Sequence, residues 1–325
     1  MRSAVNRWFE RRTWSVHDLR LEEAVAAKGA TRVSVVLPAL NEQRTVAAIV
    51  AALRRELVDR VPMIDELVVV DSGSSDETAC VASDAGARVV HVDDVLPDVP
   101  SVPGKGEALW RSLAATTGDV VAFVDADLEA FDPTFVWGTV VPLLTDPSLT
   151  FVKATYDRPL ADGTRLHPAG GGRVTELVAR PLVNLHWPEL AGFVQPLAGE
   201  YAARRSLFEQ LPFPCGYGVE VGLLVDTLAT VGLDAMAQVD VGVRRHRHQD
   251  DHALGRMAVE ILLTAQSRLH PSDRCGGHGH PVSPTLTQYT RDSDGYHAMT
   301  ADITALERPP IVTVPGYQEQ RQRSS

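Results

Sequence analysis

The stretch VVAFVDADL, residues 120–128, decides the fold class of this chain. Its nearly continuous apolar start is typical of a strand buried on both faces of a parallel sheet. Asp125 and Asp127 follow at the end of the strand, where open α/β sheets bind ligands. Because side chains alternate along an extended chain, both carboxylates point the same way. They suit a hard divalent cation, or a cation with a sugar hydroxyl, although an acidic turn that ends a strand fits them too.

Strand-like and helix-like segments alternate on both sides of this stretch. In the first half we expect strands at residues 32–37, 65–70, 88–92 and 119–124, and helices at 45–58, 77–85 and 104–117, the first capped by Asn41 or Thr45. In the second half we expect strands at 149–155, 197–204 and 235–243, and helices at 173–184, 219–231 and 254–269. This order predicts a doubly wound, mostly parallel α/β sheet with helices on both faces.

The composition narrows the classes of protein. The chain has 325 residues, of which 44% are hydrophobic and 22% charged, an ordinary globular profile. A formal net charge of −11 argues against binding of nucleic acid. With no long apolar run and no apolar signal core, we expect a cytoplasmic protein without stable membrane insertion. Cys80, Cys215 and Cys275 lack metal-ligand spacing and are expected to be reduced.

Three predicted strand ends carry polar groups to one edge of the sheet, at residues 38–42, 71–73 and 125–127. The turns contain no GxGxxG sequence, so a dinucleotide site is not predicted, and the chain has no Walker sequence. PGKGE, residues 103–107, echoes a phosphate loop only in part. Lys105 therefore has two interpretations, a solvated lysine at a helix start or an amine placed near phosphate.

Two further segments have the chemistry of ligand contacts. GGRVT, residues 171–175, puts glycines, Arg173 and the Thr175 hydroxyl before a helix, a phosphate cradle or simply a loop that starts the helix. Glu220 lies just inside another predicted helix, where it could bind two sugar hydroxyls or merely complement the helix dipole.

The motifs resemble a known family. PALNE (38–42), DSGSSDET (71–78) and DAD (125–127) resemble the nucleotide-sugar half of a GT-A-fold glycosyltransferase. PGKGEALWRSLAAT, GGGRVTELVARPL, QPLAGEYAARR, GYGVEVGLLVDT and VGVRRHRH resemble the actinobacterial glucosyl-3-phosphoglycerate synthases, over residues 14–269. The resemblance implies metal-dependent transfer of glucose from UDP-glucose to 3-phosphoglycerate with retention of the α anomer. The product would lead to methylglucose lipopolysaccharides or glucosylglycerate.

The resemblance also implies roles for single residues. The donor-binding positions are Pro38, Ala39, Leu40, Glu42, Asp71, Ser72, Lys105, Asp125, Ala126, Tyr217 and Glu220. Catalytic roles fall to Asp127, Glu220 and Lys105. Asp127 and His246 match the ligands of Mg²⁺, and a histidine ligand makes Mn²⁺ a substitute. The acceptor-binding positions are Gly171, Gly172, Arg173, Thr175, Leu197, Gly199, Arg244 and His248.

Two positions depart from the family pattern. We expect asparagine at the position of His248 in mycobacterial relatives, and the metal motif is often DSD where this chain has Ala126. In an extended segment Arg244, His246 and His248 would lie on one side, so we expect them to be presented together.

The expected organisation is an N-terminal helical extension (1–30), a nucleotide-sugar-binding half (31–148) and an acceptor-binding half of the same domain (149–270). An irregular or partly disordered tail (271–325) follows, in which residues 309–315 are a possible strand. The family suggests a homodimer. Alternatives are a mannosyl-3-phosphoglycerate synthase that uses GDP-mannose, a polyprenol-phosphate sugar transferase, which should carry a membrane anchor, and a non-catalytic nucleotide-sugar-binding regulator.

Overall fold

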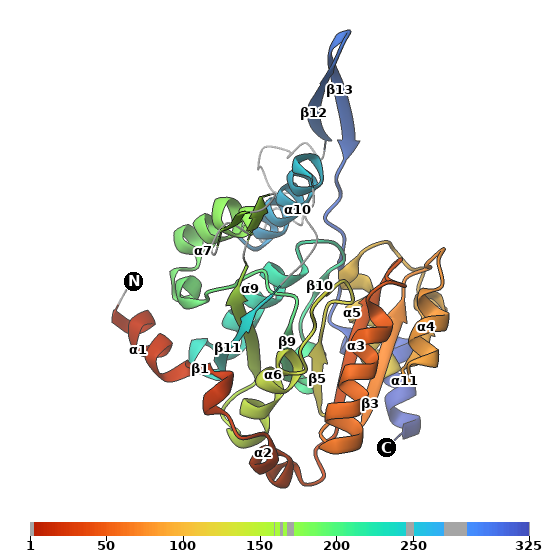
Figure 1. Ribbon diagram of the computed structural model, residues 1–325, viewed down its shortest axis with the longest axis vertical. Helices are drawn as coiled ribbons and strands as arrows, with labels where there is room; N and C mark the ends of the chain where they lie inside the picture. Colours follow the sequence, from red (N-terminus) through yellow and green to blue (C-terminus); the bar gives the residue numbers. More distant parts are fainter. Residues whose placement is uncertain are drawn as a thin grey trace.

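A computed structural model describes residues 3–158, 160–162, 165–167, 172–244, 250–269 and 285–324. An eight-stranded sheet, in the order β1-β11-β6-β9-β5-β2-β3-β4, runs through the body of the molecule (Figure 1). Its strands are β1 Thr13–Ser15, β2 Val33–Ala39, β3 Glu66–Asp71, β4 Arg88–His91, β5 Val120–Phe123, β6 Phe151–Asp157, β9 Tyr201–Arg204 and β11 Met236–Val243. All neighbours are parallel except β9, which is antiparallel to both β5 and β6. The predicted mostly parallel α/β fold is confirmed.

Helices cover both faces of the sheet. They are α1 Ser3–Arg12, α2 Leu21–Lys28, α3 Val46–Leu53, α4 Thr78–Asp84, α5 Lys105–Ala115, α6 Thr134–Thr145, α7 Arg180–His186, α8 Arg205–Phe208, α9 Val219–Val231, α10 Asp251–Leu269 and α11 Pro315–Ser324. Short helical turns are η1 Val16–Asp18, η2 Arg54–Arg60, η3 Val92–Asp94, η4 Thr175–Ala179, η5 Pro188–Gly192, η6 Leu233–Ala235 and η8 Ile311–Thr313. Three small pairs complete the described elements: β7 Leu160–Asp162 with β8 Arg165–His167, β10 Phe213–Pro214 with β14 Glu307–Arg308, and β12 Thr285–Asp292 with β13 Gly295–Asp302.

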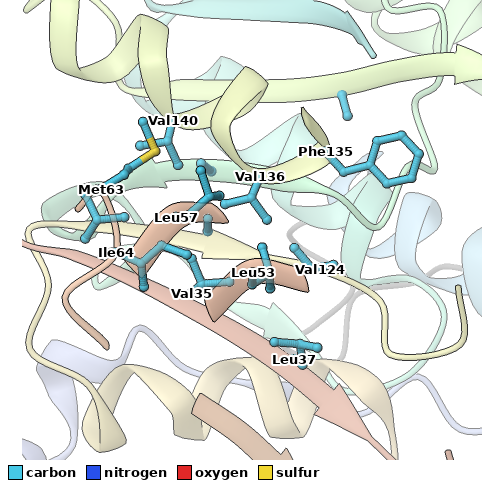
Figure 2. Packing of buried hydrophobic residues seen from close by; sticks show 14 of the residues in the cluster. Val35, Leu37, Leu53, Leu57, Met63, Ile64, Val124, Phe135, Val136 and Val140 are labelled. Carbon is cyan, nitrogen blue, oxygen red and sulfur yellow. The ribbon is translucent and has the colours of Figure 1, made fainter. Parts of the chain in front are cut away.

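Each face of the sheet has its own apolar core, which explains why its strands are apolar on both sides. Val35 and Leu37 of β2 pack with α2, α3 and α6, as Figure 2 shows for Leu53 and Val136. Val36, between them, faces the second core with α5 and α9. A strand whose two faces are both buried must be apolar at successive positions, and this is the pattern that the sequence displays.

Two expectations for local structure need correction. Thr45 is the N-cap of α3, but neither its side chain nor that of Asn41 caps the helix. The Thr45 hydroxyl instead donates to the backbone oxygen of Ala126 at 2.6 Å, and thereby links the turn after β2 to the end of β5. The strand expected at 197–204 begins only at Tyr201, because the preceding residues turn beside Asp125.

The tail is more regular than its composition predicted. Within its described part, β12 and β13 form a hairpin that projects from the body (Figure 1). β14 pairs with β10. Residues 311–313 form a 3-10 turn where a strand was expected. The reason is long-range contact, since Arg308 donates to Glu107 at 2.6 Å and the Trp110 indole donates to the oxygen of Pro309 at 2.9 Å.

The N-terminal segment is not purely helical, since β1 joins the central sheet beside β11. Cys80 is exposed, Cys215 is buried, and neither is in a disulfide, whereas Cys275 lies outside the described residues. In the described parts of the chain, none of the helices combines the length and apolarity needed to cross a bilayer.

Candidate active site

The ends of β2 and β3 bring the expected uridine-facing residues together. Ala39 pairs with Asp71 in register, and the amide of Ser72 donates to the oxygen of Ala39 at 2.9 Å. Leu40 follows Ala39 directly and exposes 54% of its surface. The structure therefore assembles Pro38, Ala39, Leu40, Glu42, Asp71 and Ser72 at one edge of the sheet.

Lys105 joins three elements in a charge cluster. Its ammonium pairs with Asp125, which follows β5, and lies 2.6 Å from Glu220 in the first turn of α9. Glycines on both sides of Lys105 make this possible. A Cβ on Gly104 would come within 2.2 Å of the oxygen of Cys215, and Gly104 has a φ of +128°. The glycines of PGKGE thus allow α5 to start in close contact with the chain after β10. Glu220 does not merely complement the helix dipole, since it also forms an ion pair with Lys105.

Arg244 completes this cluster from the other side. One guanidinium nitrogen lies 2.7 Å from Asp125 and 3.3 Å from Glu200, and the other donates to the Tyr156 hydroxyl at 3.1 Å. We expected Arg244 to be presented toward an acceptor, but its side chain is only 6% exposed and faces inward. The reason is that the backbone amide of Arg244 donates to the backbone oxygen of Asp157. This hydrogen bond extends the pairing of β11 with β6 by one residue.

The two carboxylates of DAD differ in their surroundings. Burial favours the neutral form of Asp125, but Lys105 and Arg244 outweigh it and hold the pKa of Asp125 well below its usual value. Burial and the charge of Asp125 raise the pKa of Asp127 above its usual value. The Asp127 side chain is still 44% exposed, and among the described residues the cation paired with it, Arg244, is 3.5 Å away. Asp125 is therefore ionised and held in place by two cations, whereas the more exposed Asp127 is the carboxylate that can accept a ligand.

Asp127 suits a divalent cation by its chemistry, since Mg²⁺ is usually held by one or two carboxylates plus water and phosphate oxygens. Its raised pKa also indicates a site where added positive charge would stabilise the ionised carboxylate. Within the described residues, no group of three or more His, Cys, Asp or Glu side chains forms a complete metal cage. The expected second ligand, His246, lies outside the described residues.

The expected phosphate cradle is described from Gly172 onward. Gly172 has a φ of +83°, and the Thr175 hydroxyl is buried without a hydrogen-bond partner among the described residues. The guanidinium of Arg173, 44% exposed, is ion-paired with Asp251 at the start of α10. A buried hydroxyl in need of a partner next to a half-exposed arginine favours an anionic ligand. Gly171 and His248 lie outside the described residues.

The remaining predicted residues lie around the same cluster. A Cβ on Gly199 would come within 2.2 Å of the Asp125 carboxylate, so the chain after Leu197 passes directly against it. Tyr217 is exposed, and its amide donates to Glu260 of α10 at 2.6 Å. Four buried residues with polar side-chain groups in this region were not predicted from the sequence: Lys153, Tyr156, Glu200 and Tyr201. A lysine inside the apolar run FVKATY was the signal that could have revealed the first of them.

Comparisons with known proteins agree with this architecture. Residues 34–216 match glycosyl transferase family 2. Glucosyl-3-phosphoglycerate synthase of Mycolicibacterium smegmatis is 46% identical over 309 residues, which cover 95% of this chain and 98% of that protein.

Two crystal structures are similar over nearly the whole chain. Mannosyl-3-phosphoglycerate synthase from Rubrobacter xylanophilus is 40% identical, with a TM-score of 0.87 over 95% of this chain and 99% of that one. Glucosyl-3-phosphoglycerate synthase from Mycobacterium tuberculosis, in complex with Mn²⁺, UDP-glucose and phosphoglyceric acid, is 45% identical, with a TM-score of 0.77 over 90% and 95% of the two chains. The chain therefore belongs to glycosyl transferase family 2 and, within it, to the glucosyl-3-phosphoglycerate synthases.

Proposed function

We propose that this protein transfers glucose from UDP-glucose to 3-phosphoglycerate, with retention of the α configuration, to give glucosyl-3-phosphoglycerate. The observation that carries the proposal is the cluster of Lys105, Asp125 and Glu220 beside the open carboxylate of Asp127, at the edge of the sheet where nucleotides bind. The close relative from Mycobacterium tuberculosis binds UDP-glucose, phosphoglyceric acid and Mn²⁺ together, which supports the same three ligands here.

We assign the metal, Mg²⁺ or Mn²⁺, to Asp127 and His246. When bound, the cation supplies positive charge opposite the diphosphate that leaves with the nucleotide. Asp125 is already neutralised by Lys105 and Arg244, so its role is to contact the ribose or the glucose and to keep Lys105 in place.

On the donor side, the backbone around Pro38–Leu40 and the carboxylate of Glu42 read the uracil, with Asp71 and Ser72 near the ribose. Lys105 fixes one oxygen of Glu220, which leaves the other oxygen to accept hydrogen bonds from glucose hydroxyls. The buried ion pair thus turns a flexible glutamate into an oriented one, and an oriented acceptor distinguishes hexoses by the geometry of their hydroxyl groups.

On the acceptor side, Arg173 and Thr175 hold the phosphate, and the backbone at Leu197–Gly199, which passes against Asp125, contacts the acceptor. The Arg173 guanidinium forms an ion pair with the Asp251 carboxylate in the structure, so an incoming phosphate replaces that carboxylate as its partner. We also propose, from the resemblance to the family, that the protein acts as a homodimer in the cytoplasm.

The second candidate donor is GDP-mannose, because the Rubrobacter mannosyl-3-phosphoglycerate synthase has the higher TM-score, 0.87 against 0.77. A donor screen decides between them. Purified protein is incubated with 3-phosphoglycerate, Mg²⁺ and UDP-glucose, UDP-mannose, GDP-glucose or GDP-mannose in turn, and released nucleotide is measured. We expect fastest release from UDP-glucose, and preference for GDP-mannose would replace our proposal with the second one.

Arg173→Ala is expected to raise the KM for 3-phosphoglycerate by about 10-fold or more, because one charge-assisted hydrogen bond contributes about 1.5–3 kcal/mol. The KM for UDP-glucose should change less than about twofold, since the donor site lies elsewhere. Initial rates at varied concentrations of each substrate measure both constants. Arg60→Ala, which removes an exposed arginine paired with Glu56, is the control. An unchanged acceptor KM in Arg173→Ala would remove the cradle from the proposal.

The product is expected to keep the α linkage of the donor. An inverting reaction needs a carboxylate base opposite the leaving group, and double displacement needs a carboxylate nucleophile below the anomeric carbon. Asp125 and Glu220, as described, are ion-paired with Lys105, and Asp127 is assigned to the metal. A front-face reaction requires neither group, because the departing phosphate accepts the proton of the acceptor hydroxyl. Proton NMR of fresh product gives the anomeric coupling, and a β-linked product would contradict this mechanism.

A further inference from the structure

Lys153 is a buried charged residue that the mechanism above does not use. It lies in the middle of β6 with 1% of its surface exposed, and it pairs in register with Tyr201 of β9. Its ammonium donates to the backbone oxygen of Ala198 at 2.6 Å and lies 4.4 Å from the centre of the Tyr201 ring. Lysine is rarely buried to this extent unless it is paired, so its retention in a strand of a central sheet requires an explanation.

The surroundings of Lys153 make its charge costly. Burial lowers its pKa to about 7, Lys105 acts in the same direction, and the acidic groups offset only part of this effect. The ionisable groups that face it come from four places in the fold: Lys105 of α5, Asp125 after β5, Glu200 and Tyr201 at the start of β9, and Glu220 of α9. These include the cluster at the candidate active site, so Lys153 lies close enough to that cluster for its charge to be influenced by it.

The segment Ala198–Glu200 connects Lys153 to the site. Gly199 lies directly against the Asp125 carboxylate, and Glu200 is paired with Arg244 and accepts from Tyr156 at 2.8 Å. Those contacts hold the segment on the side of the substrates. The hydrogen bond from Lys153 to Ala198 holds it on the side of the core. The two sets of contacts together fix the position of the Ala198–Glu200 backbone relative to the Asp125 carboxylate.

We propose that Lys153 is a positioning residue for sugar transfer: from inside the sheet it fixes the Ala198–Glu200 segment against Asp125, and thereby sets the floor of the site for the hexose and the acceptor hydroxyl. This inference rests on the proposed function. It deepens that function by assigning to a core amine the alignment of two substrates that a displacement of about 1 Å would disturb.

The test uses three full-length variants. Lys153→Met keeps the length of the side chain and removes the donor and the charge, whereas Lys153→Gln keeps an N–H donor for Ala198 without the charge. Lys28→Met is the matched control, because it makes the same substitution at a lysine of α2 that pairs with Asp65 and has no part in the candidate site. The measurements are kcat, the KM for UDP-glucose, and the midpoint of urea unfolding at pH 6 and pH 9.

For Lys153→Met we expect kcat to fall by about 30-fold, with the KM for UDP-glucose within about threefold of the wild type. The same variant should unfold at a higher urea concentration than the wild type. Because the pKa of Lys153 is lower in the folded state, its charge destabilises the fold fully below pH 7, and this effect disappears as the pH rises toward the unfolded value. The gain should therefore be larger at pH 6 than at pH 9. Lys153→Gln should recover most of kcat, and Lys28→Met should behave as the wild type.

A residue that only supports packing would lose activity and stability together, so a parallel fall of both in Lys153→Met would overturn the proposal. An unchanged kcat would overturn it as well. If the wild type and Lys28→Met fail to transfer glucose from UDP-glucose, the proposed function fails instead, and the kcat comparison is made with the nucleotide sugar that the donor screen identifies.

Discussion

Asp127→Ala is expected to abolish glucose transfer, with kcat lower by at least about a thousandfold, while the protein remains folded. The Asp127 carboxylate is the one acidic group of the DAD turn whose oxygens are not taken up by close ion pairs, so it is the group that can hold the cation. Without the cation, the negative charge that develops on the diphosphate is left to Lys105, whose own charge is balanced by two carboxylates.

The stability of Asp127→Ala provides the complementary measurement. Because burial and the charge of Asp125 raise the pKa of Asp127 in the folded state, ionisation of this carboxyl costs stability, and the cost appears as the pH rises above the ordinary pKa of an aspartate. The free energy of unfolding of Asp127→Ala should thus be no lower than that of the wild type at pH 7. Circular dichroism during urea unfolding measures it, and titration calorimetry with UDP and Mn²⁺ should show loss of metal-dependent binding.

Asp59→Ala is the matched control, since Asp59 is an exposed aspartate of η2 with a long contact to Arg54 at 3.9 Å. It should retain full activity. EDTA should inactivate the wild type, and Mg²⁺ or Mn²⁺ in excess should restore it. Activity of Asp127→Ala near the wild-type value, or full activity of the wild type in EDTA, is incompatible with the assignment.

The sequence predicted the sheet well because the strands of a two-sided core carry a strong local signal. VVAFVDADL placed both the strand at 120–123 and the edge at which Asp125 and Asp127 emerge. The helix expected at 219–231 also has those bounds in the structure. Period and breaker residues sufficed at these positions, since each element is defined by residues within its own length.

The charge cluster was beyond that kind of reasoning. Lys105 and Glu220 are 115 positions apart, and nothing near either residue indicates that it pairs with the other. PGKGE was ambiguous for the same reason. Its glycines are required because the backbone oxygens of Cys215 and Pro214 leave no room for a Cβ at Gly104 and Gly106, and these oxygens are distant in the sequence. The described tail was misjudged because Arg308 and Tyr317 are fixed by distant partners, Glu107 and Glu209.

The predicted role of Arg244 was wrong because the pairing of β11 with β6 continues one residue further than expected. As a member of an exposed basic run it would contact the acceptor, but one further hydrogen bond to β6 turns it toward Asp125 and Glu200. Glu200 has no exposed side-chain surface, and burial raises its pKa even with Arg244 beside it. The guanidinium therefore neutralises a carboxylate that water cannot reach.

Arg244→Met is accordingly expected to lower the free energy of unfolding by about 3–5 kcal/mol at pH 8, because breaking a buried pair leaves an uncompensated charge. The loss should be smaller at pH 5. A raised pKa in the folded state means that the protonated Glu200 is tolerated at low pH, and that stability falls as the pH rises through that pKa. Urea unfolding at the two pH values measures the difference.

Arg268→Met separates stability from function. Arg268 is likewise buried between two carboxylates, Asp226 at 2.5 Å and Glu307 at 2.7 Å, but these are 17% and 23% exposed and lie outside the site. Its loss should cost less stability, and the folded fraction should keep the wild-type kcat. In Arg244→Met, Asp125 loses one of the two cations that pair with it in the described part of the chain and Asp127 loses its ion pair, so the folded fraction should be nearly inactive. Equal kcat values for the two variants, each corrected for the folded fraction, would mean that Arg244 stabilises the sheet edge without shaping the reaction.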